Sequence, residues 1–365
     1  MPLKWVIVAG GTGGHIFPGI ALAEYLLQQK KEVVFISGKR KVEKEILKNR
    51  PFSVYELDVE GFLGKSLINK IKAFNKMIKA ILKSYKLIKN IDPDIILATG
   101  GYISFPVVLV GKLQRKVLGL HEQNIEPGMA NRVLSKLVDK IFISIKGSEK
   151  FFPKEKVIFS GNIIRKEILT KVKKEHTGKG LLIIGGSLGA KFINELATEI
   201  VPLLLKEIED LRVIHQTGLD NYKEVRDKYN LVIKNIKNAK ERLTILPFIE
   251  NMAWAYSQAD LVLSRAGATT LAELFATGKP AILIPFPYAT RNHQEKNAKA
   301  VAEKGGAIVI RQNEADSKKV YKIIKNLLNN PQKLKNMSDI MHSFFIKDSE
   351  KIIINTLEGL VKNAQ

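Results

Sequence analysis

The sequence contains no cysteine, which excludes disulfide bonds, cysteine-ligated zinc sites and thiol nucleophiles, and which is compatible with a reducing cytoplasm. Long apolar runs are also missing. The longest, residues 102–111, has about half of the roughly 18–20 residues that a membrane-spanning helix needs. The first residues, MPLKWVIVAGG, lead directly into a strand-like segment and lack the layout of a signal peptide. We therefore expect a cytoplasmic protein, unless an affinity for lipid holds it at a membrane surface.

Acidic side chains are too few to balance the basic ones. The chain has 59 Lys+Arg against 36 Asp+Glu, a formal net charge of +23. Such a field attracts polyanions, which include nucleic acid, anionic lipid and phosphorylated substrates. Lysine-rich compositions are also common in thermophiles and in AT-biased genomes, so the charge alone does not choose a partner. It is concentrated in residues 61–90, which carry eight lysines and no acidic residue.

The remaining composition is that of a folded chain with more than one core. Its 365 residues exceed one ordinary domain, and 45% hydrophobic with 26% charged residues excludes disorder, collagen and coiled coil. Short apolar runs alternate with helical stretches over residues 6–145 and again over residues 181–287, a pattern typical of parallel strands that are each followed by a helix. We predict two Rossmann-like, doubly wound α/β domains facing across a cleft, with helices only from about residue 316 onward.

Two glycine-rich motifs stand where a predicted strand turns into a helix. GGTGGH (residues 10–15) and GGSLGA (residues 185–190) share one plan, which indicates a weak internal repeat. Glycines let the backbone approach a ligand, and a helix N-terminus offers N–H groups to a phosphate. The first motif is not the dinucleotide fingerprint, because Ile16 stands where the third glycine belongs, and it lacks GK[ST]. Any strand-to-helix turn favours glycine, but two such loops at strand ends together indicate a ligand at the cleft.

Polar side chains follow other predicted strands. In SRAGATTLAEL (residues 264–274), Glu273 is placed either to accept the two hydroxyls of a ribose or to stabilise the helix dipole. Gln294 follows the next strand, and amide side chains suit sugar hydroxyls because they both donate and accept. HEQN (residues 121–124) ends another strand, where it forms either a reactive cluster or a buried structural network.

Together these motifs resemble the MurG family, the peripheral undecaprenyldiphospho-muramoylpentapeptide β-N-acetylglucosaminyltransferases of peptidoglycan synthesis. Seven motifs occur in family order between Gly10 and Ala298: GGTGGH, TGGYISFP, HEQN, GNIIR, GGSLGA, SRAGATTLAE and HQEKNA. The resemblance implies a GT-B fold. It implies an acceptor-binding, membrane-associating domain over residues 1–160, a UDP-sugar domain over residues 161–340, and a final helix in residues 341–365 that packs back on the first domain.

The implied reaction is an inverting transfer of N-acetylglucosamine from UDP-N-acetylglucosamine to the C4 hydroxyl of the muramoyl-pentapeptide of lipid I, which forms lipid II. The resemblance favours His15 as general base, since histidine changes charge near neutral pH, with Glu122 as second candidate. Neither spacing nor charge decides between the two. The implied substrate-binding residues are Thr12, Gly13, Gly14, Asn124, Arg165, Ser187, Ile249, Ala268, Thr269, Thr270, Leu271, Ala272, Glu273 and Gln294.

Within that set the resemblance places Arg165 and Ser187 at the diphosphate, the Ile249 backbone at the uracil and Gln294 at the N-acetylglucosamine. The family often has GNPVR where this chain has GNIIR, a change that keeps the arginine. No cofactor is implied, and no His/Asp cluster has metal-ligand spacing. The Asp-x-Asp of residues 92–94 precedes its strand, so we interpret it as a turn and predict a metal-independent enzyme.

The basic stretch supports two interpretations. One helical stripe is formed by Ile71, Phe74, Ile78, Ile81, Tyr85 and Ile88, and lysines run alongside it at positions 72, 76, 79, 83 and 86. In the first, the apolar stripe faces the core and the lysines face water. In the second, the helix lies on the anionic cytoplasmic leaflet together with residues 61–70. The expected membrane contacts are Ile71, Phe74, Ile78, Lys72, Lys76 and Lys79, and we expect a peripheral protein on the cytoplasmic face of the cell membrane.

The expected partners are UDP-N-acetylglucosamine, lipid I, an anionic membrane surface and, by resemblance alone, cell-wall and division proteins. A nucleic-acid-binding protein is the non-enzyme alternative. We expect no nucleic acid, because the chain has no recognisable module for it and only 7% aromatic residues. The enzyme alternatives are a glycolipid-forming transferase and a UDP-sugar 2-epimerase, and the epimerase needs extra carboxylates around the donor sugar.

Overall fold

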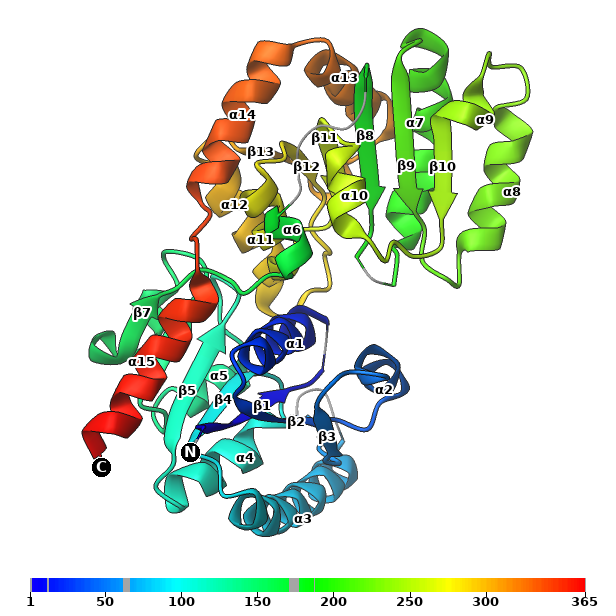
Figure 1. Cartoon of the computed structure of the whole chain (residues 1–365). Coiled ribbons are helices and arrows are strands. Elements are labelled where there is room, and N and C mark those ends of the chain that lie inside the picture. The colour runs from blue at the N-terminus through cyan, green and yellow to red at the C-terminus, as the bar shows by residue number, and fades with distance from the viewer. Residues whose placement is uncertain (1, 12, 62–65, 171–176, 187, 365) are drawn as a thin grey trace. The chain divides into compact units, whose positions relative to one another are not determined.

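The computed structural model describes residues 2–11, 13–61, 66–170, 177–186 and 188–364 (Figure 1). The chain forms two compact units. Unit 1 comprises Met1–Arg165 with Ile346–Gln365, and unit 2 comprises Lys166–Phe345. The domain boundaries expected from the sequence, after residues 160 and 340, lie five residues before these junctions.

Unit 1 is built on a seven-stranded, all-parallel sheet with strand order β3-β2-β1-β4-β5-β6-β7. The strands are β1 Lys4–Ala9, β2 Glu32–Ser37, β3 Ser53–Glu56, β4 Ile95–Gly100, β5 Val117–Glu122, β6 Lys140–Ile143 and β7 Val157–Phe159. The helices are α1 Gly13–Gln28, α2 Lys41–Leu47, α3 Leu67–Ile91, α4 Ser104–Leu113, α5 Met129–Leu134 and α15 Ser349–Ala364. Strand order reverses between β1 and β4, the position at which open parallel sheets bind their ligands.

Unit 2 repeats this plan with six parallel strands in the order β10-β9-β8-β11-β12-β13. The strands are β8 Lys179–Ile184, β9 Leu211–Gln216, β10 Leu243–Leu246, β11 Leu261–Ser264, β12 Ala281–Leu283 and β13 Ala307–Val309. The helices are α6 Lys166–Thr170, α7 Lys191–Glu207, α8 Tyr222–Val232, α9 Ala239–Arg242, α10 Met252–Ser257, α11 Ala268–Thr277, α12 His293–Ala302, α13 Ser317–Leu328 and α14 Pro331–Ser343. The predicted doubly wound α/β class is confirmed, and so are the helices beyond residue 316.

The first strand shows why the core strands read as continuous apolar runs. Alternate residues of a strand point to opposite faces of the sheet, and both faces of β1 are covered. Trp5 and Ile7 pack with residues of α1 and α15 on one face, whereas Val6 and Val8 pack with residues of α3 and α4 on the other. Figure 1 shows α15 alongside β5, so the end of the chain completes the core of unit 1.

Helix α3 faces the core with only part of the stripe that the sequence predicts. Its buried side combines the small or flexible residues Ala73, Met77, Ala80 and Ser84 with Ile88 of the predicted stripe, and Ile81 of that stripe also packs against the core. Three large residues of the predicted stripe are exposed instead, with exposed fractions of 57% for Phe74, 42% for Ile78 and 48% for Tyr85. A core-facing role for these three is therefore wrong, because small side chains let the helix lie closer to the sheet than large ones. Leu82 on the same side is 61% exposed.

The lysines of α3 differ in their surroundings. Lys72 and Lys79 are exposed. Lys76 instead forms ion pairs with Asp58, at 3.2 Å, and with Glu60. These contacts raise the pKa of Lys76, the hydrogen bond to Glu60 having the largest effect. The side chain of Ile71 lies outside the described part of the structure.

Candidate active site

The first glycine loop joins β1 to α1 and is held by a carboxylate that the sequence analysis missed. Gly11 N donates to Glu43 Oε1 at 2.6 Å, and Arg40 N donates to Glu43 Oε2 at 2.9 Å. Glu43 is buried, with an exposed fraction of 3%. An internal anion thus occupies the Gly11 N–H group, and the expectation that this loop offers free N–H groups to a phosphate is wrong at that position. Thr12 lies outside the described residues, and Gly13 and Gly14 open α1.

His15 lies one residue further along α1, partly buried and in contact with two strand ends. Its Nδ1 is 2.9 Å from Gln123 Oε1, and its backbone oxygen accepts a hydrogen bond from Thr99 Oγ1 at 2.8 Å. The ring lies against Gly100 at the end of β4, where a Cβ atom would be 2.6 Å from His15 Nδ1. Only glycine at position 100 leaves this space, so the TGGY motif makes room for the imidazole.

Glu122, at the end of β5, is fully buried. Asn124 donates to its Oε1 through the backbone N at 2.9 Å and the side-chain Nδ2 at 3.2 Å, and Asn131 Nδ2 donates to Oε2 at 2.8 Å. Burial raises the pKa of Glu122, an effect that the hydrogen bonds from Asn124 and the nearby His15 oppose. The motif HEQN therefore contains both a buried structural network and a residue that touches His15.

That network continues behind the imidazole. Gln123 Nε2 donates to Thr99 O at 2.8 Å and to His121 Nδ1 at 3.0 Å. The other ring nitrogen of His121 lies 3.1 Å from Gly161 O. His121 is fully buried, and burial lowers its pKa to about 4, so the ring is neutral at neutral pH.

The second glycine loop, between β8 and α7, is shaped by close backbone packing. A Cβ atom on Gly189, whose φ is +76°, would be 2.0 Å from Thr217 O, so no other residue fits there. Asn194 Nδ2 donates to the same Thr217 oxygen at 2.9 Å, which ties α7 to the end of β9. Ser187, the predicted diphosphate ligand, lies outside the described residues.

Helix α11 begins at Ala268 and carries the third set of predicted residues. Its Thr269 Oγ1 is buried and has no hydrogen-bond partner within the described ranges of the chain. Glu273 is 5% exposed and accepts a hydrogen bond from Tyr256 OH at 3.0 Å. Because Glu273 is the sixth residue of the helix, its interpretation as a first-turn glutamate is wrong. Of the other predicted positions, Ala268, Leu271 and Ala272 are buried and Thr270 is partly buried.

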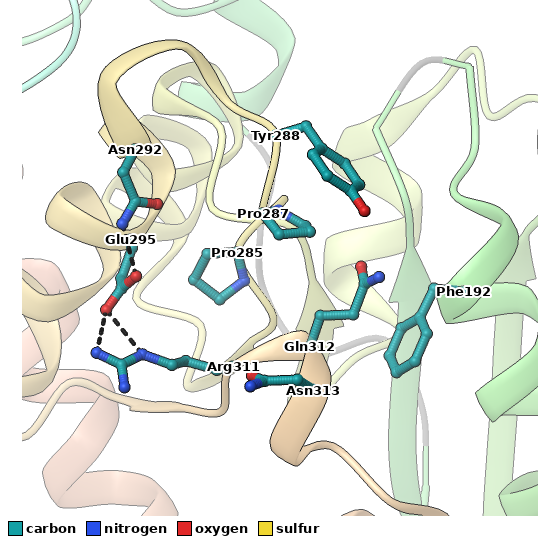
Figure 2. Close-up of a pocket in the computed structure, with 9 residues that line it drawn as sticks. All are labelled: Phe192, Pro285, Pro287, Tyr288, Asn292, Glu295, Arg311, Gln312 and Asn313. Carbon is teal, nitrogen blue, oxygen red and sulfur yellow. Dashed lines mark hydrogen bonds and ion pairs between the residues drawn. The ribbon is translucent and has the colours of Figure 1, made fainter.

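A cavity of about 510 Å³ lies at the start of α12 (Figure 2). It is lined by Phe192, Pro285, Pro287, Tyr288, Asn292, Glu295, Arg311, Gln312 and Asn313. Figure 2 shows Glu295 between Asn292, which donates to it at 2.7 Å, and Arg311, which donates at 2.8 Å. With Lys299, which has the largest effect, these contacts lower the pKa of Glu295 to about 2. Gln294, one residue before Glu295, accepts a hydrogen bond from Phe286 N at 3.0 Å.

Arg265 is a second residue that the sequence analysis missed, although it lies within a motif. It is 7% exposed and donates to Ile284 O at 3.0 Å, Pro285 O at 3.2 Å and Gln312 Oε1 at 2.8 Å. Burial lowers its pKa to about 10, so the buried guanidinium stays charged at neutral pH. Its position directly after β11 was the available signal.

Two predicted substrate-binding residues, Ile249 and Arg165, belong to none of the motifs described above in this section. Ile249 is buried in the turn after β10, and Arg165 is partly buried at the junction where the chain passes from unit 1 to unit 2. Asp92 ends α3 in the left-handed region and Asp94 precedes β4, which confirms the turn at residues 92–94. Among the residues that the structure describes, no three His, Asp or Glu side chains are grouped to hold a metal ion. None of the described helices is both long and apolar enough to cross a bilayer.

Comparisons with known proteins identify the family. The model of the Glycosyltransferase family 28 N-terminal domain matches residues 5–143, and that of the Glycosyltransferase family 28 C-terminal domain matches residues 180–353. A Thermodesulfovibrio yellowstonii protein is 38% identical over 99% of both chains, and a Halothermothrix orenii protein is 38% identical over 99% of this chain and 100% of the relative. Both are named UDP-N-acetylglucosamine--N-acetylmuramyl-(pentapeptide) pyrophosphoryl-undecaprenol N-acetylglucosamine transferase.

Solved structures agree with these relatives. The crystal structure of Acinetobacter baumannii MurG superposes with a TM-score of 0.78 at 30% identity, covering 98% of this chain and all of that one. A putative UDP-N-acetylglucosamine 2-epimerase from Listeria monocytogenes, 16% identical with a TM-score of 0.70 over 100% of this chain and 98% of that one, shares the fold alone. The resemblance found in the motifs and the GT-B fold are therefore confirmed, and the chain belongs to glycosyltransferase family 28.

Proposed function

We infer that this chain transfers N-acetylglucosamine from UDP-N-acetylglucosamine to the C4 hydroxyl of the muramoyl-pentapeptide of lipid I, forming lipid II for peptidoglycan synthesis. The observation that carries this function is similarity at 38% identity, over nearly the whole chain, to relatives named for this transfer. It is a glycosyltransferase. The alternatives of a 2-epimerase and a basic nucleic-acid-binding protein have no comparable support.

We propose His15 as the group that takes the proton from the acceptor. The hydroxyl oxygen forms a bond to the anomeric carbon from the face opposite the diphosphate, the bond from that carbon to the diphosphate oxygen breaks, and UDP leaves. His15 is supported because it is only partly buried, in the first turn of α1, which follows β1 where the strand order reverses. Glu122 is the weaker candidate, because it is fully buried and three N–H groups already bind its oxygens.

We propose that unit 2 holds the nucleotide sugar at the second glycine loop and the start of α11. A departing diphosphate gains negative charge, which a helix N-terminus stabilises. The buried Thr269 hydroxyl supports this position, because the described residues give it no hydrogen-bond partner and a phosphate oxygen supplies one. Glu273 would accept the ribose hydroxyls, Gln294 would contact the N-acetylglucosamine and the Ile249 backbone the uracil.

We further propose that the exposed face of α3 contacts an anionic membrane, the surface where a lipid-linked acceptor resides. Phe74, Ile78 and Tyr85 supply apolar area, and Lys72 and Lys79 supply charge worth about 1 kcal/mol each near an anionic surface. Lys76, although predicted as a contact, contributes less because two carboxylates neutralise it.

Flotation with anionic liposomes tests the membrane contact. Replacing Phe74 and Ile78 by Ser should remove most of the bound fraction, because the inserted apolar area is lost. The matched control changes Leu231 and Val232, which are 69% and 51% exposed on unit 2, to Ser and should float like the wild type. Equal flotation of both double variants contradicts the proposed face.

Transfer of labelled N-acetylglucosamine from its UDP donor to a short-chain lipid I analogue tests the function. A β1,4-linked disaccharide product is expected. Binding of UDP-N-acetylglucosamine without transfer would support the proposed donor site and contradict lipid I as the acceptor. Absence of both would refute the function, and C2 epimerisation of the free nucleotide sugar would point to the epimerase.

A further inference from the structure

The hydrogen-bond partners of Gln123 determine which way its amide points. Thr99 O, 2.8 Å from Gln123 Nε2, is a backbone carbonyl and can only accept a hydrogen bond. If the amide were reversed, two oxygens would face each other at that distance inside the protein. The amide nitrogen therefore faces Thr99, and the amide oxygen faces His15 Nδ1 at 2.9 Å.

The orientation of Gln123 in turn determines the proton on His15. An amide oxygen can only accept, so His15 Nδ1 must carry a hydrogen and donate it. A neutral imidazole has one N–H group, and placing it on Nδ1 leaves the lone pair on Nε2. Nε2 is then the ring atom that can remove a proton from a hydroxyl group.

His121 completes this arrangement from behind. Gly161 O, 3.1 Å from His121 Nε2, can only accept, so Nε2 of the neutral ring carries the hydrogen and Nδ1 carries the lone pair. That lone pair faces Gln123 Nε2 at 3.0 Å, and the same amide nitrogen lies 3.1 Å from His121 O. Ser144 Oγ lies 3.1 Å from His121 Nε2. His121 accepts only while neutral, and burial, which lowers its pKa to about 4, keeps it so.

We propose that Gln123, supported by His121, is a positioning residue that fixes His15 in the Nδ1–H tautomer and so makes Nε2 the proton acceptor of the transfer. This inference rests on the proposed function. A neutral amide fixes the tautomer without adding charge beside the ring. Among the described residues, the titratable groups Glu122 and His121, both fully buried, interact electrostatically with His15.

Nitrogen-15 NMR of the full chain with labelled histidine tests the tautomer without any substrate. His15→Ala identifies the His15 signals. At a pH where the ring is neutral, the wild type should show a protonated Nδ1 and an unprotonated Nε2. In Gln123→Leu we expect a shift toward the Nε2–H form, which free imidazole side chains favour. A wild-type His15 protonated on Nε2 overturns the proposal, whatever the variants do.

Kinetics test whether the tautomer matters to transfer. Gln123→Leu should lower kcat roughly 10- to 100-fold, part of the 10²–10⁴-fold that a general base contributes, with both KM values changed less than about threefold. In a His15→Ala background the same substitution should lower kcat no further, because the group that it positions is gone.

The matched control is Ser148→Ala, which removes another fully buried side-chain hydrogen bond of unit 1, to Ile145 O at 2.9 Å. It should leave kcat and the His15 tautomer unchanged. An equal loss of kcat with and without His15, or a raised KM at unchanged kcat, contradicts a positioning role. If the wild type performs no transfer, the proposed function fails, whereas the NMR result still decides the tautomer separately.

Discussion

The two glycine loops follow the first strands of two similar sheets, yet different contacts hold them in place. In unit 1, the buried carboxylate of Glu43 accepts the N–H group of Gly11 and the loop leads to a partly exposed imidazole. In unit 2, backbone packing of Gly189 against Thr217 shapes the loop, and no carboxylate of the described residues is bonded to residues 185, 186, 188 or 189. An internal anion where a ligand phosphate could bind suits a loop that carries a reactive side chain. A loop without one suits a diphosphate.

The two units also differ in the hydrogen-bond partners of their fully buried histidines, His121 in unit 1 and His215 in unit 2. His215 is enclosed in the core of unit 2, with Asn194 Oδ1 at 3.1 Å from Nε2 and Tyr229 OH at 3.0 Å from Nδ1. His121 lies elsewhere in its sheet, on β5, two strands from β1, whereas His215 lies on β9, next to β8; the partners of His121 lead through Gln123 to His15. A buried histidine therefore belongs to a closed structural network in unit 2 and, in our proposal, supports a proton-accepting residue in unit 1.

Removing the imidazole of unit 1 should have the largest effect. We expect His15→Ala to lower kcat by about 10²–10⁴-fold, the usual contribution of a general base, with little change in the KM of UDP-N-acetylglucosamine. Steady-state kinetics at saturating acceptor measures both. A kcat of His15→Ala within tenfold of the wild-type value would show that His15 is not the proton acceptor. The proposed difference between the two loops would then be wrong.

Acid should destabilise both units through their buried histidines. Burial lowers the pKa of His121 from 6.5 to about 4 and that of His215 to about 3, so the folded chain binds fewer protons than the unfolded one. Their stabilising contributions are complete above about pH 6.5 and decrease as pH falls toward 4 and 3, by roughly 3 kcal/mol or more each. Glu122, whose pKa is raised, acts in the opposite sense as pH rises.

Each unit contains one of the two tryptophans, so fluorescence can follow urea unfolding of each separately. Trp5 reports on unit 1 in a Trp254→Phe background, and Trp254 reports on unit 2 in a Trp5→Phe background. His121→Asn should flatten the acid dependence of the Trp5 signal alone, and His215→Asn that of the Trp254 signal alone. An acid dependence unaffected by either substitution would exclude these histidines as its cause.

The backbone packing of the second loop predicts a difference between two neighbouring glycines. A methyl group at Gly189 would lie 2.0 Å from Thr217 O, whereas nothing lies within 4 Å of one at Gly186, although φ is positive at both. Gly186→Ala should cost about 1–2 kcal/mol of unfolding free energy from backbone strain, and Gly189→Ala more than that. Trp254 fluorescence measures both. Equal costs would mean that the loop is not held by this contact.

The last prediction concerns the buried carboxylate of Glu43 in unit 1. Glu43→Ala leaves the N–H groups of Gly11 and Arg40 without their acceptor and should lower the unfolding free energy of unit 1 by about 1–3 kcal/mol. Glu43→Gln keeps one acceptor oxygen and should cost less. Urea unfolding followed by Trp5 fluorescence distinguishes the two variants. An unfolding free energy of Glu43→Ala equal to that of the wild type would contradict the role of the carboxylate in holding this loop.

Much of the fold was predictable because strands buried on both faces, such as β1 and β4, appear in the sequence as continuous apolar runs. The exposed edge strand β3 and the three-residue strands β7 and β13 carry no such signal. The buried face of α3 was predicted only in part, because the prediction gave large apolar residues more weight than the small residues that pack closest to the sheet.

The site was predictable only in part. The glycine-rich motif and the family resemblance located His15, and strand-end polarity located the HEQN motif, since parallel strands bring their carboxyl ends to one edge of a sheet. The partners that give these residues their chemistry are remote in sequence: Gln123 lies 108 residues from His15, and Glu43 lies 32 residues from Gly11. No local pattern encodes such pairs. The direction of an amide, and with it a tautomer, follows only from the assembled contacts.

Calorimetric titration of UDP into two full-length variants tests the division of tasks between the loops most directly. Glu43→Gln alters the first loop, and Gly189→Ala alters the second. We predict that Glu43→Gln binds UDP with the wild-type Kd, whereas Gly189→Ala binds at least tenfold more weakly while unit 1 keeps its wild-type Trp5 unfolding transition. Weaker UDP binding by Glu43→Gln together with wild-type binding by Gly189→Ala would contradict the account.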